Sequence, residues 1–451
     1  MKAWKSILIL FFATVLPSFA ALPVFSLAST FSETTQYTKP LTLNDVDIPI
    51  NTVRVNFREP VSISSYHFLQ PVSFSLSKFD KELTLSELNF TKNLNFNWAV
   101  FLGKARFFRV NMDSSGHFYF TYFNQPVIFN KVYCNKACLF LHSFFKNVKF
   151  LHSTFNQMLS FEYVNAQQLV FQNCQFEGDV NMRHMKVENL TFDNSFLYKG
   201  LNLSSAKFSG ALTFINTELY GYLDLSYIEM SEFPIDLTMI KTPNDGMLVK
   251  LNLMGADIER IKLNYLHFKL YFPQEASPIQ VDDIYLRLLR NFKSREDTVS
   301  YKILLAEYRH LSYLRDNKYL TDLISKHWWN YSTNPDWIFY WMGILIIFYT
   351  TINTIFYEKL SMHYFDIPFL VTSLRPFYVK KNPIIRFVYY FPRALLFTFL
   401  MFFGTQFRMR SGLKEFKSNN IFVNLYFIII IITGMLCMFF ILRYLIALIS
   451  S

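Results

Sequence analysis

The residue types that most often carry out chemistry are few in this chain and widely spaced. His142 and His152 are ten residues apart, and His117 and His184 stand alone. A metal site needs several ligands that converge on one point, so outward, solvated histidines are the better interpretation. The sequence shows no glycine-rich phosphate loop, no Ser-His-Asp set and no paired carboxylates. We therefore predict no metal, no cofactor and no enzymatic activity.

The four cysteines do not indicate a disulfide framework. Four cysteines in 451 residues are too few for a disulfide scaffold. The alternation of apolar residues predicts that Cys134 and Cys174 point inward, where a thiol behaves as a small apolar group, and that Cys138 points outward. Opposite-facing side chains argue against a Cys134–Cys138 disulfide.

Composition indicates a membrane protein with a large buried interior. Hydrophobic residues make up 52% of the chain and charged residues 17%, against a usual charged share of about 25%, which excludes a disordered chain. The net charge is +11, and the residues from Val281 onward contribute 20 Lys and Arg against 11 Asp and Glu, a net +9. The basic excess therefore lies in the same part of the chain as the longest apolar runs.

The N-terminus has the order of a secretory signal peptide. Lys2 and Lys5 precede an uncharged run from Ser6 to Phe19, and small residues at Ser18 and Ala20 come after Pro17. The alternative is an uncleaved anchor, for which the run is short, since a span needs about 20 residues. We expect a signal peptide over 1–20 and an extracytoplasmic location for the domain after it.

The middle of the chain repeats every five or six residues. Apolar-polar-apolar triplets such as Ala105-Arg106-Phe107 and Leu169-Val170-Phe171 recur from Leu83 onward. The repeat is clearest in two eleven-residue units, LNLSSAKFSGA and LTFINTELYGY, that begin at Leu201. Strands of three residues separated by short turns are too short for an ordinary β-sandwich, which is the alternative, and fit the sides of a solenoid.

This pattern resembles the pentapeptide-repeat family, whose repeat has Ala in the first and Leu or Phe in the third position of such a triplet. The resemblance implies a right-handed, four-sided β-helix over 83–270, with an N-terminal cap region over 21–82. At 20 to 22 residues a coil it would form about nine coils and a rod of about 40 Å. Phe108–His117 and Ser231–Lys250 interrupt the register and are expected to be loops or bulges.

The period changes to a helical one after Pro278. Apolar residues at helical spacing predict a helical hairpin neck over 281–330, joined near Ser294–Asp297. Transmembrane helices are expected over 337–357 and 421–446, and a short re-entrant or membrane helix over 384–407. Ten Lys and Arg against three Asp and Glu lie between Glu358 and Asn420. The positive-inside rule places both flanks of the middle segment in the cytoplasm, which favours the re-entrant form over three complete spans.

The order of apolar segments resembles the two-span ion-channel module found at the C-terminus of some pentapeptide-repeat proteins. In such a module Thr398 would lie on the pore helix, Gly404, Thr405 and Gln406 would begin the filter, and Gly434 would lie in the inner helix. The sequence departs from that pattern, because no T-V-G-Y-G is present and Phe407-Arg408 comes after the place of the filter. The resemblance thus indicates a degenerate channel-like module.

Together these observations predict a membrane-anchored, extracytoplasmic pentapeptide-repeat protein of a bacterial inner membrane, with ion conduction or sensing as its function. The alternative is a non-conducting, membrane-tethered scaffold that binds a partner along the β-helix. Expected partners are the lipid bilayer, further copies joined through the membrane module, and an extracytoplasmic protein. The near-neutral solenoid and the basic residues beside apolar segments argue against nucleic acid.

Overall fold

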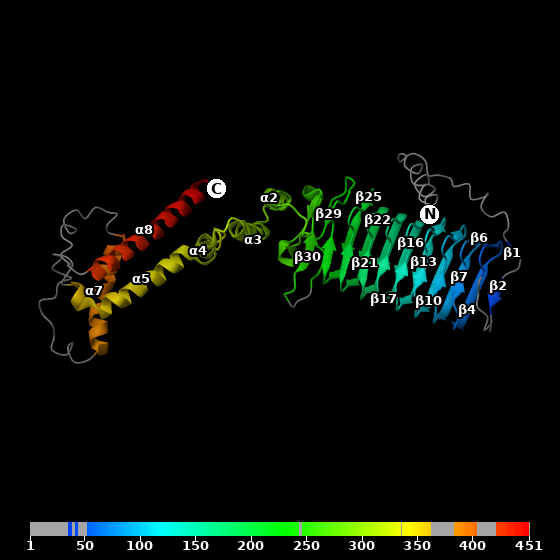
Figure 1. Ribbon diagram of the computed structural model, residues 1–451, viewed down its shortest axis with the longest axis horizontal. Coiled ribbons are helices and arrows are strands. Elements are labelled where there is room, and N and C mark those ends of the chain that lie inside the picture. Colours follow the sequence, from blue (N-terminus) through cyan, green and yellow to red (C-terminus); the bar gives the residue numbers. More distant parts are fainter. Residues whose placement is uncertain are drawn as a thin grey trace, which may run out of the picture. The chain divides into compact units, whose positions relative to one another are not determined.

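The computed structural model describes residues 35–37, 41–43, 52–242, 246–334, 336–361, 383–403 and 421–450. The chain divides into two units, Met1–Leu288 and Leu289–Ser451. The first is a β-solenoid and the second is helical (Figure 1). The predicted signal peptide, residues 1–20, and much of the predicted cap region lie outside the described residues.

The strands of the first unit form three parallel sheets in the described part of the chain. The largest sheet contains β1 (Thr35–Tyr37), β2 (Leu41–Leu43), β3 (Val55–Phe57), β4 (Val61–Phe68), β6 (Lys78–Phe79), β7 (Leu83–Phe90), β9 (Val100–Phe101), β10 (Ala105–Met112), β12 (Tyr122–Phe123), β13 (Val127–Asn130), β14 (Tyr133–Cys134), β16 (Phe144–Leu151), β17 (Thr154–Phe155), β19 (Asn165–Gln172), β20 (Gln175–Phe176), β22 (Lys186–Asp193), β23 (Phe196–Leu197), β25 (Lys207–Phe208), β26 (Leu212–Ile215) and β27 (Glu218–Leu219). The second contains β5 (Val72–Ser73), β8 (Leu94–Asn95), β11 (Gly116–His117), β15 (Cys138–Leu139), β18 (Leu159–Ser160), β21 (Asp179–Asn181), β24 (Gly200–Asn202), β28 (Tyr222–Asp224), β30 (Val249–Asn252) and β32 (Phe268–Leu270). The third joins β29 (Ile235–Asp236) to β31 (Ile261–Lys262).

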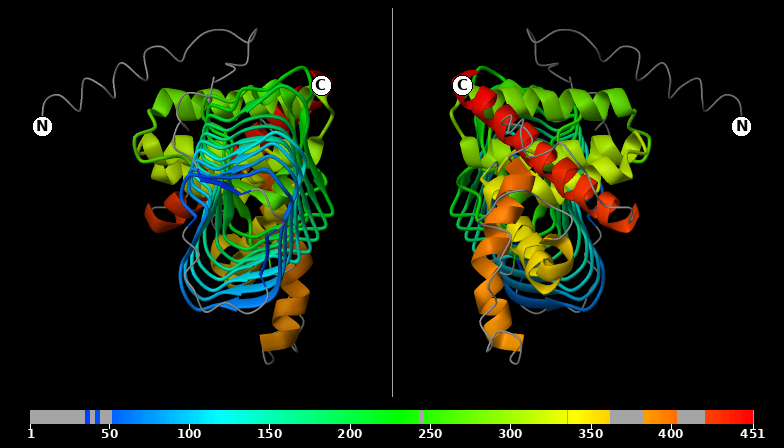
Figure 2. Two further views of the ribbon diagram at one scale, coloured as in Figure 1. Left: turned by 90° about the vertical axis from the view of Figure 1, so that its right-hand side faces the viewer. Right: turned by 90° about the vertical axis from the view of Figure 1, so that its left-hand side faces the viewer.

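Strand register confirms the predicted solenoid. Leu83 of β7 pairs with Ala105 of β10, 22 residues later, and Val148 of β16 pairs with Leu169 of β19, 21 residues later. About ten turns of this kind cover residues 56–270, and Figure 2 shows the coils one behind another. Because each coil pairs with the next, the backbone groups of the strands are satisfied between coils.

Inward phenylalanines form columns through the solenoid, as the triplet pattern predicts. Phe107, Phe129, Phe150, Phe171 and Phe192 stack in succession, with ring centroids 4.5 to 5.1 Å apart. All five side chains are buried. Columns of stacked rings therefore account for the high phenylalanine content of the sequence.

Each coil turns twice through a residue with positive φ. Such residues recur every 10 or 11 positions from Arg54 to Tyr227, and none of them is glycine. An inward hydroxyl often comes next in the chain: Ser143 Oγ accepts a hydrogen bond from the Thr121 amide (3.0 Å), and Ser153 Oγ accepts one from the Val132 amide (3.1 Å). These hydroxyls satisfy amides that the tight corners would otherwise leave buried without a partner.

The structure corrects the predicted limits of the solenoid. Coil pairing begins before Leu83, since β4 pairs in parallel with β7. Phe108–His117 was predicted to be a loop or bulge, and this is wrong for most of it, because β10 continues to Met112 and Gly116–His117 forms β11. Val110, Met112 and Gly116 occupy inward positions in this stretch. Arg109 is a corner residue with positive φ, and it shifts the alternation of inward and outward residues while the coil continues.

Ser231–Lys250, expected to be a loop or bulge, forms an enlarged coil, because Tyr222 pairs with Lys250, 28 positions later, and β29 and the start of β30 are short strands within it. Cys138 is buried, not outward, because the inward positions of that coil are Cys138 and Phe140. Cys134, Cys138, Cys174 and Cys437 are all free and buried, and burial raises the pKa of the Cys134 thiol well above its ordinary value.

Helices make up the remainder of the described chain. After the short 3-10 helices η2 (Ile258–Arg260) and η3 (Tyr265–His267) come α2 (Pro278–Ser294), α3 (Thr298–Arg315), α4 (Tyr319–Trp329), α5 (Trp337–Ile355), α6 (Tyr357–Ser361), α7 (Pro383–Phe403) and α8 (Ile421–Ser450). Asp297 caps α3 by accepting a hydrogen bond from the Ser300 amide (3.0 Å).

Candidate functional site

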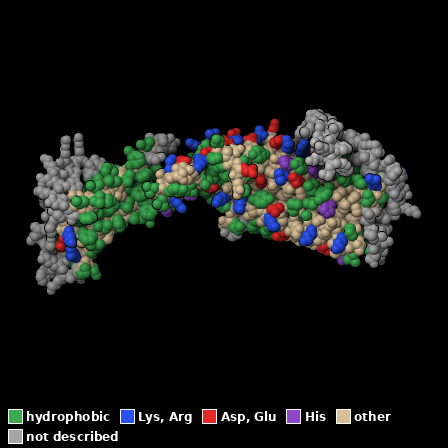
Figure 3. Space-filling model, viewed as in Figure 1, with side chains coloured by type: hydrophobic (Ala, Val, Ile, Leu, Met, Phe, Trp, Pro, Cys, Tyr) green, Lys and Arg blue, Asp and Glu red, His purple; other side chains and the backbone are tan. Residues whose placement is uncertain are grey.

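In the described part of the second unit, three helices are long and apolar enough to cross a membrane. They are α5 (Trp337–Ile355), α7 (Pro383–Phe403) and the segment Ile421–Ile446 of α8. Hydrophobic side chains cover this part of the surface in Figure 3. Residues 384–403 of the predicted 384–407 segment thus lie in a 21-residue helix, which is long enough for a full span.

Charged residues of α7 lie in its first half and have partners. Arg386 pairs with Glu358 of α6 (3.5 Å), whose carboxylate also accepts a hydrogen bond from Tyr390 (3.1 Å). The Arg393 guanidinium lies 4.3 Å from the centre of the Tyr389 ring. The second half, from Ala394 to Phe403, has no charge. The re-entrant and the fully spanning forms of this segment both remain open predictions.

A chain of hydrogen bonds crosses all three helices at Thr398. Tyr426 of α8 donates to Asn353 Oδ1 of α5 (2.9 Å), and Asn353 Nδ2 donates to Thr398 Oγ1 of α7 (2.8 Å). Thr398 in turn donates to the Ala394 carbonyl (2.8 Å). Asn353 and Thr398 are fully buried. Interhelical hydrogen bonds of this kind hold membrane helices together, since lipid offers polar groups no alternative partner.

Gly434 lies where α8 passes close to the backbone of α7. A Cβ atom at this position would lie 2.0 Å from the Phe402 carbonyl oxygen. Only glycine therefore allows the two backbones to come this near. A second polar contact joins α5 and α8, between the hydroxyls of Tyr349 and Thr433 (3.1 Å).

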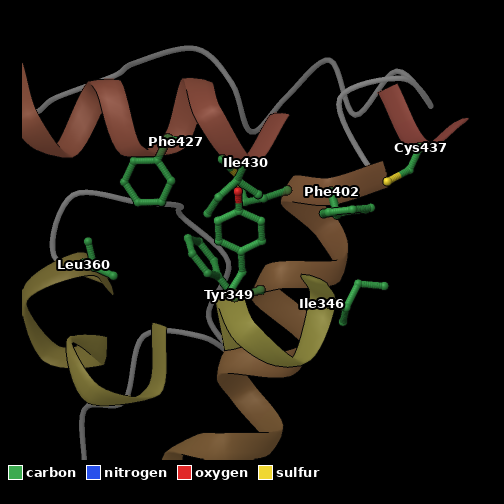
Figure 4. Packing of buried hydrophobic residues seen from close by; sticks show 9 residues of the cluster. Ile346, Tyr349, Leu360, Phe402, Phe427, Ile430 and Cys437 are labelled. Carbon is green, nitrogen blue, oxygen red and sulfur yellow. The ribbon is translucent and has the colours of Figure 1, made fainter. Parts of the chain in front are cut away.

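Apolar side chains surround these contacts. Figure 4 shows Ile346, Tyr349, Leu360, Phe402, Phe427, Ile430 and Cys437, which are buried together with Phe397 and Met401. The polar chain at Thr398 thus belongs to a bundle that also buries a cluster of apolar side chains.

The predicted pore residues fall into two groups. Thr398 and Gly434 are both used in packing between helices of a single chain. Gly404, Thr405 and Gln406 lie outside the described residues.

Asn353 and Tyr426 were not predicted from the sequence, although a signal was present. Each is a polar residue within a long uncharged run.

A second polar cluster lies just before the first membrane-length helix. Asp322 of α4 is buried and accepts hydrogen bonds from Tyr331 (2.8 Å) and His310 (2.9 Å). Arg309 of α3 binds the Tyr331 carbonyl and the Ser332 hydroxyl. Asn330, Tyr331 and Ser332 all have positive φ, so these bonds hold a strained connection between α4 and α5.

The carboxyl of Asp322 is kept ionised by this cluster. Burial alone would raise its pKa, but the hydrogen bonds from His310 and Tyr331 outweigh burial and the pKa of Asp322 is lowered. The pKa of Tyr331 is raised by burial and by its bond to Asp322. Asp322 is therefore a carboxylate at neutral pH, and Tyr331 remains protonated.

Among the described residues, no group of three or more His, Cys, Asp or Glu side chains is placed to hold a metal ion. His142, expected to be a solvated histidine, is stacked between Phe120 and Tyr163.

Comparison with models of known protein families finds no match for the chain, and comparison with curated proteins finds none either.

Proposed function

We propose that this protein is a membrane-tethered β-solenoid scaffold, whose C-terminal helices serve as an anchor and whose solenoid binds a partner. One observation carries the proposal: Thr398 and Gly434, the described residues of the predicted pore, make contacts between helices of one chain. A conducting pore formed by several copies would need such positions to face a shared axis. Their use inside the bundle favours an anchor over a channel.

The proposal keeps the expectations that the sequence raised about location. Residues 1–20 would direct the solenoid to the extracytoplasmic side of a bacterial inner membrane. The solenoid would be a right-handed, four-sided coil of the pentapeptide type. The support for these statements is the charge and hydropathy order of the N-terminus and the five- and six-residue repeat.

Ion flux into liposomes tests the anchor against the channel. Purified full-length protein should give no flux above that of empty vesicles. Flux that Gly404→Leu removes would contradict the proposal and support conduction. Gly343→Leu on α5 is the matched control, because no atom lies within 4 Å of the added Cβ position.

Reporter fusions test the location. A reporter active only outside the cytoplasm should be active at Asn317 and silent at Lys381 and Ser418 if α7 returns to the cytoplasmic side. Activity at Ser418 would establish three complete spans. Silence at Asn317 would place the solenoid in the cytoplasm and overturn the proposed location.

A further inference from the structure

The two corners of each solenoid coil have the same backbone and very different side chains. At one corner the positive-φ residues are Arg54, Leu76, Trp98, Phe120, His142, Tyr163, His184, Ser205 and Tyr227, which we call the aromatic row after the rings from Trp98 to His184. At the other they are Ser65, Glu87, Arg109, Lys131, His152, Asn173, Asn194 and Asn216, which we call the polar row. If the backbone conformation alone selected the corner residues, the same residue types would be expected at both corners.

The backbone does not explain the aromatic row. At both corners φ lies between 46° and 62°, and the amide of the corner residue donates to the next coil: His142 to the Glu162 carbonyl (3.1 Å) and His152 to the Gln172 carbonyl (2.9 Å). Asn tolerates positive φ well, whereas a bulky aromatic residue there is unusual. Asn and His, which this geometry favours, occupy four of the eight polar-row corners but only two of the aromatic-row corners, whereas Trp98, Phe120 and Tyr163 are residues that it disfavours.

The aromatic row forms one exposed stack. Trp98, Phe120, His142, Tyr163 and His184 stack in order, with ring centroids 4.2 to 4.8 Å apart and planes within about 11° of parallel. Trp98 is 52% exposed, Phe120 43% and Tyr163 48%. Stacking uses the ring faces, so the row offers the edges of its rings to solvent.

This geometry excludes several classes of ligand. A sugar or a nucleobase stacks on a ring face, and within the row these faces are already covered by neighbouring rings. Charged side chains flank the row only in its last two stacked coils, at Glu162, Arg183 and Lys186, and the first three stacked coils offer a charged ligand no partner. Burial lowers the pKa of His142, against the opposing effect of Glu162, so the imidazole in the middle of the stack is neutral at pH 7.

The spacing of the row points to the partner. Ring edges repeat at the distance between coils, about 4.8 Å, and a partner can meet every edge only if its own side chains repeat at that distance. A second copy of this chain carries such a row. We propose that the aromatic row is an interface at which two copies of the solenoid pair side by side. This inference rests on the proposed scaffold role and names its partner.

The size of the row sets the expected strength of pairing. From Trp98 to His184 the row spans four coil steps, about 19 Å at that spacing. A stable dimer buries about 800 Å² on each partner, which is more than a single row supplies. We therefore expect weak pairing in dilute detergent and strong pairing between copies held in one membrane, where the effective concentration is high.

Cysteine cross-linking of the full-length protein in liposomes tests the inference. All four natural cysteines are buried, so an introduced surface cysteine is the reactive thiol. His142→Cys should form a disulfide-linked dimer under mild oxidation at least ten times more than His152→Cys, its matched control on the polar row. Tyr163→Cys and Asn173→Cys provide a second such pair, in case one variant fails to fold.

A further variant locates the interface. Phe120→Lys in the Tyr163→Cys protein should reduce cross-linking at least tenfold, and Asn194→Lys in the same protein should leave it unchanged. Equal cross-linking at the two corners, no cross-linking at the aromatic row, or cross-linking that survives Phe120→Lys would overturn the inference. Ion flux is a separate measurement, so failure of this pairing and failure of the anchor proposal are distinguishable.

Discussion

The solenoid and the C-terminal helices both bury apolar side chains, but they fix the neighbours of each residue differently. In the solenoid, hydrogen bonds join residues 21 or 22 positions apart, so Phe150 lies between Phe129 and Phe171 in one column. In the helices, backbone bonds are local, and contacts between helices depend on individual residues such as Asn353 and Gly434. Repetition makes one core predictable, whereas the other depends on a few contacts.

The largest effect is expected where the repeated column is broken. Phe171→Asp places a carboxylate between the rings of Phe150 and Phe192, where it has no partner. Burying it should cost several kcal/mol, and we expect loss of protease-resistant protein. Gln167→Asp on the same strand is the control, because Gln167 is exposed and should tolerate the change. Equal losses in the two variants would show that the strand register is wrong.

A smaller effect is expected where Gly434 of α8 meets α7. Gly434→Leu drives a side chain into the Phe402 backbone, and overpacking of this kind costs about 1 to 3 kcal/mol. We expect the variant to unfold at lower denaturant concentration in detergent, with the solenoid intact. Gly343→Leu should leave the midpoint unchanged. If both glycine variants behave alike, α7 and α8 do not meet at Gly434.

The hydrogen-bond chain across the helices should contribute less again. Asn353→Leu removes the acceptor of Tyr426 and the donor to Thr398. Single interhelical bonds contribute about 0.6 kcal/mol on average in membranes, so a loss of about 1 kcal/mol is expected in the same unfolding measurement. Thr351→Val is the control, because the Thr351 hydroxyl bonds only within its own helix, to the Ile347 carbonyl (2.9 Å). An equally large loss of stability in Thr351→Val would contradict the role of Asn353 in joining the three helices.

These differences also explain what the sequence could predict. The inward columns, such as Phe107 to Phe192, are predictable because an apolar residue recurs at the same position of successive repeats. The predicted break at Phe108–His117 was wrong because Gly116 and Met112 are inward residues outside the usual residue types. Uncharged runs predicted the membrane-length helices. No repeat indicates that Asn353 meets Thr398, 45 residues away, so the contacts of the candidate site could not be predicted.

The aromatic row shows the same limit within the solenoid. Its residues are 21 or 22 positions apart, and their types vary from Trp98 to His184. The triplet pattern places inward residues and says nothing of which outward positions share a corner. Only the repeated positive φ brings these side chains into one line.

The smallest expected effect is a dependence of local stability on pH, which should distinguish the helical unit from the solenoid. The pKa of Asp322 is lowered in the folded protein, so its carboxylate stabilises the cluster fully above its ordinary pKa of about 3.9. That stability is lost as the pH falls through the lower folded value. Below about pH 4 we therefore expect the connection at Asn330–Ser332 to lose about 1 kcal/mol of local stability. Protease should then cleave this connection faster.

Matched variants tie this pH dependence to one carboxyl group. Asp322→Asn should make the connection sensitive already at pH 7 and remove most of the change between pH 7 and pH 3.5. Asp316→Asn should leave the profile unaltered, because Asp316 is exposed and pairs with Lys318 (2.9 Å) away from the strained residues. The phenylalanine columns have no group that titrates, so the solenoid should keep most of its protease resistance at pH 3.5, although acid protonates His142 against the burial that lowers its pKa. Parallel sensitivity of solenoid and connection would mean that acid acts on the whole chain and that the Asp322 cluster does not control the α4–α5 junction.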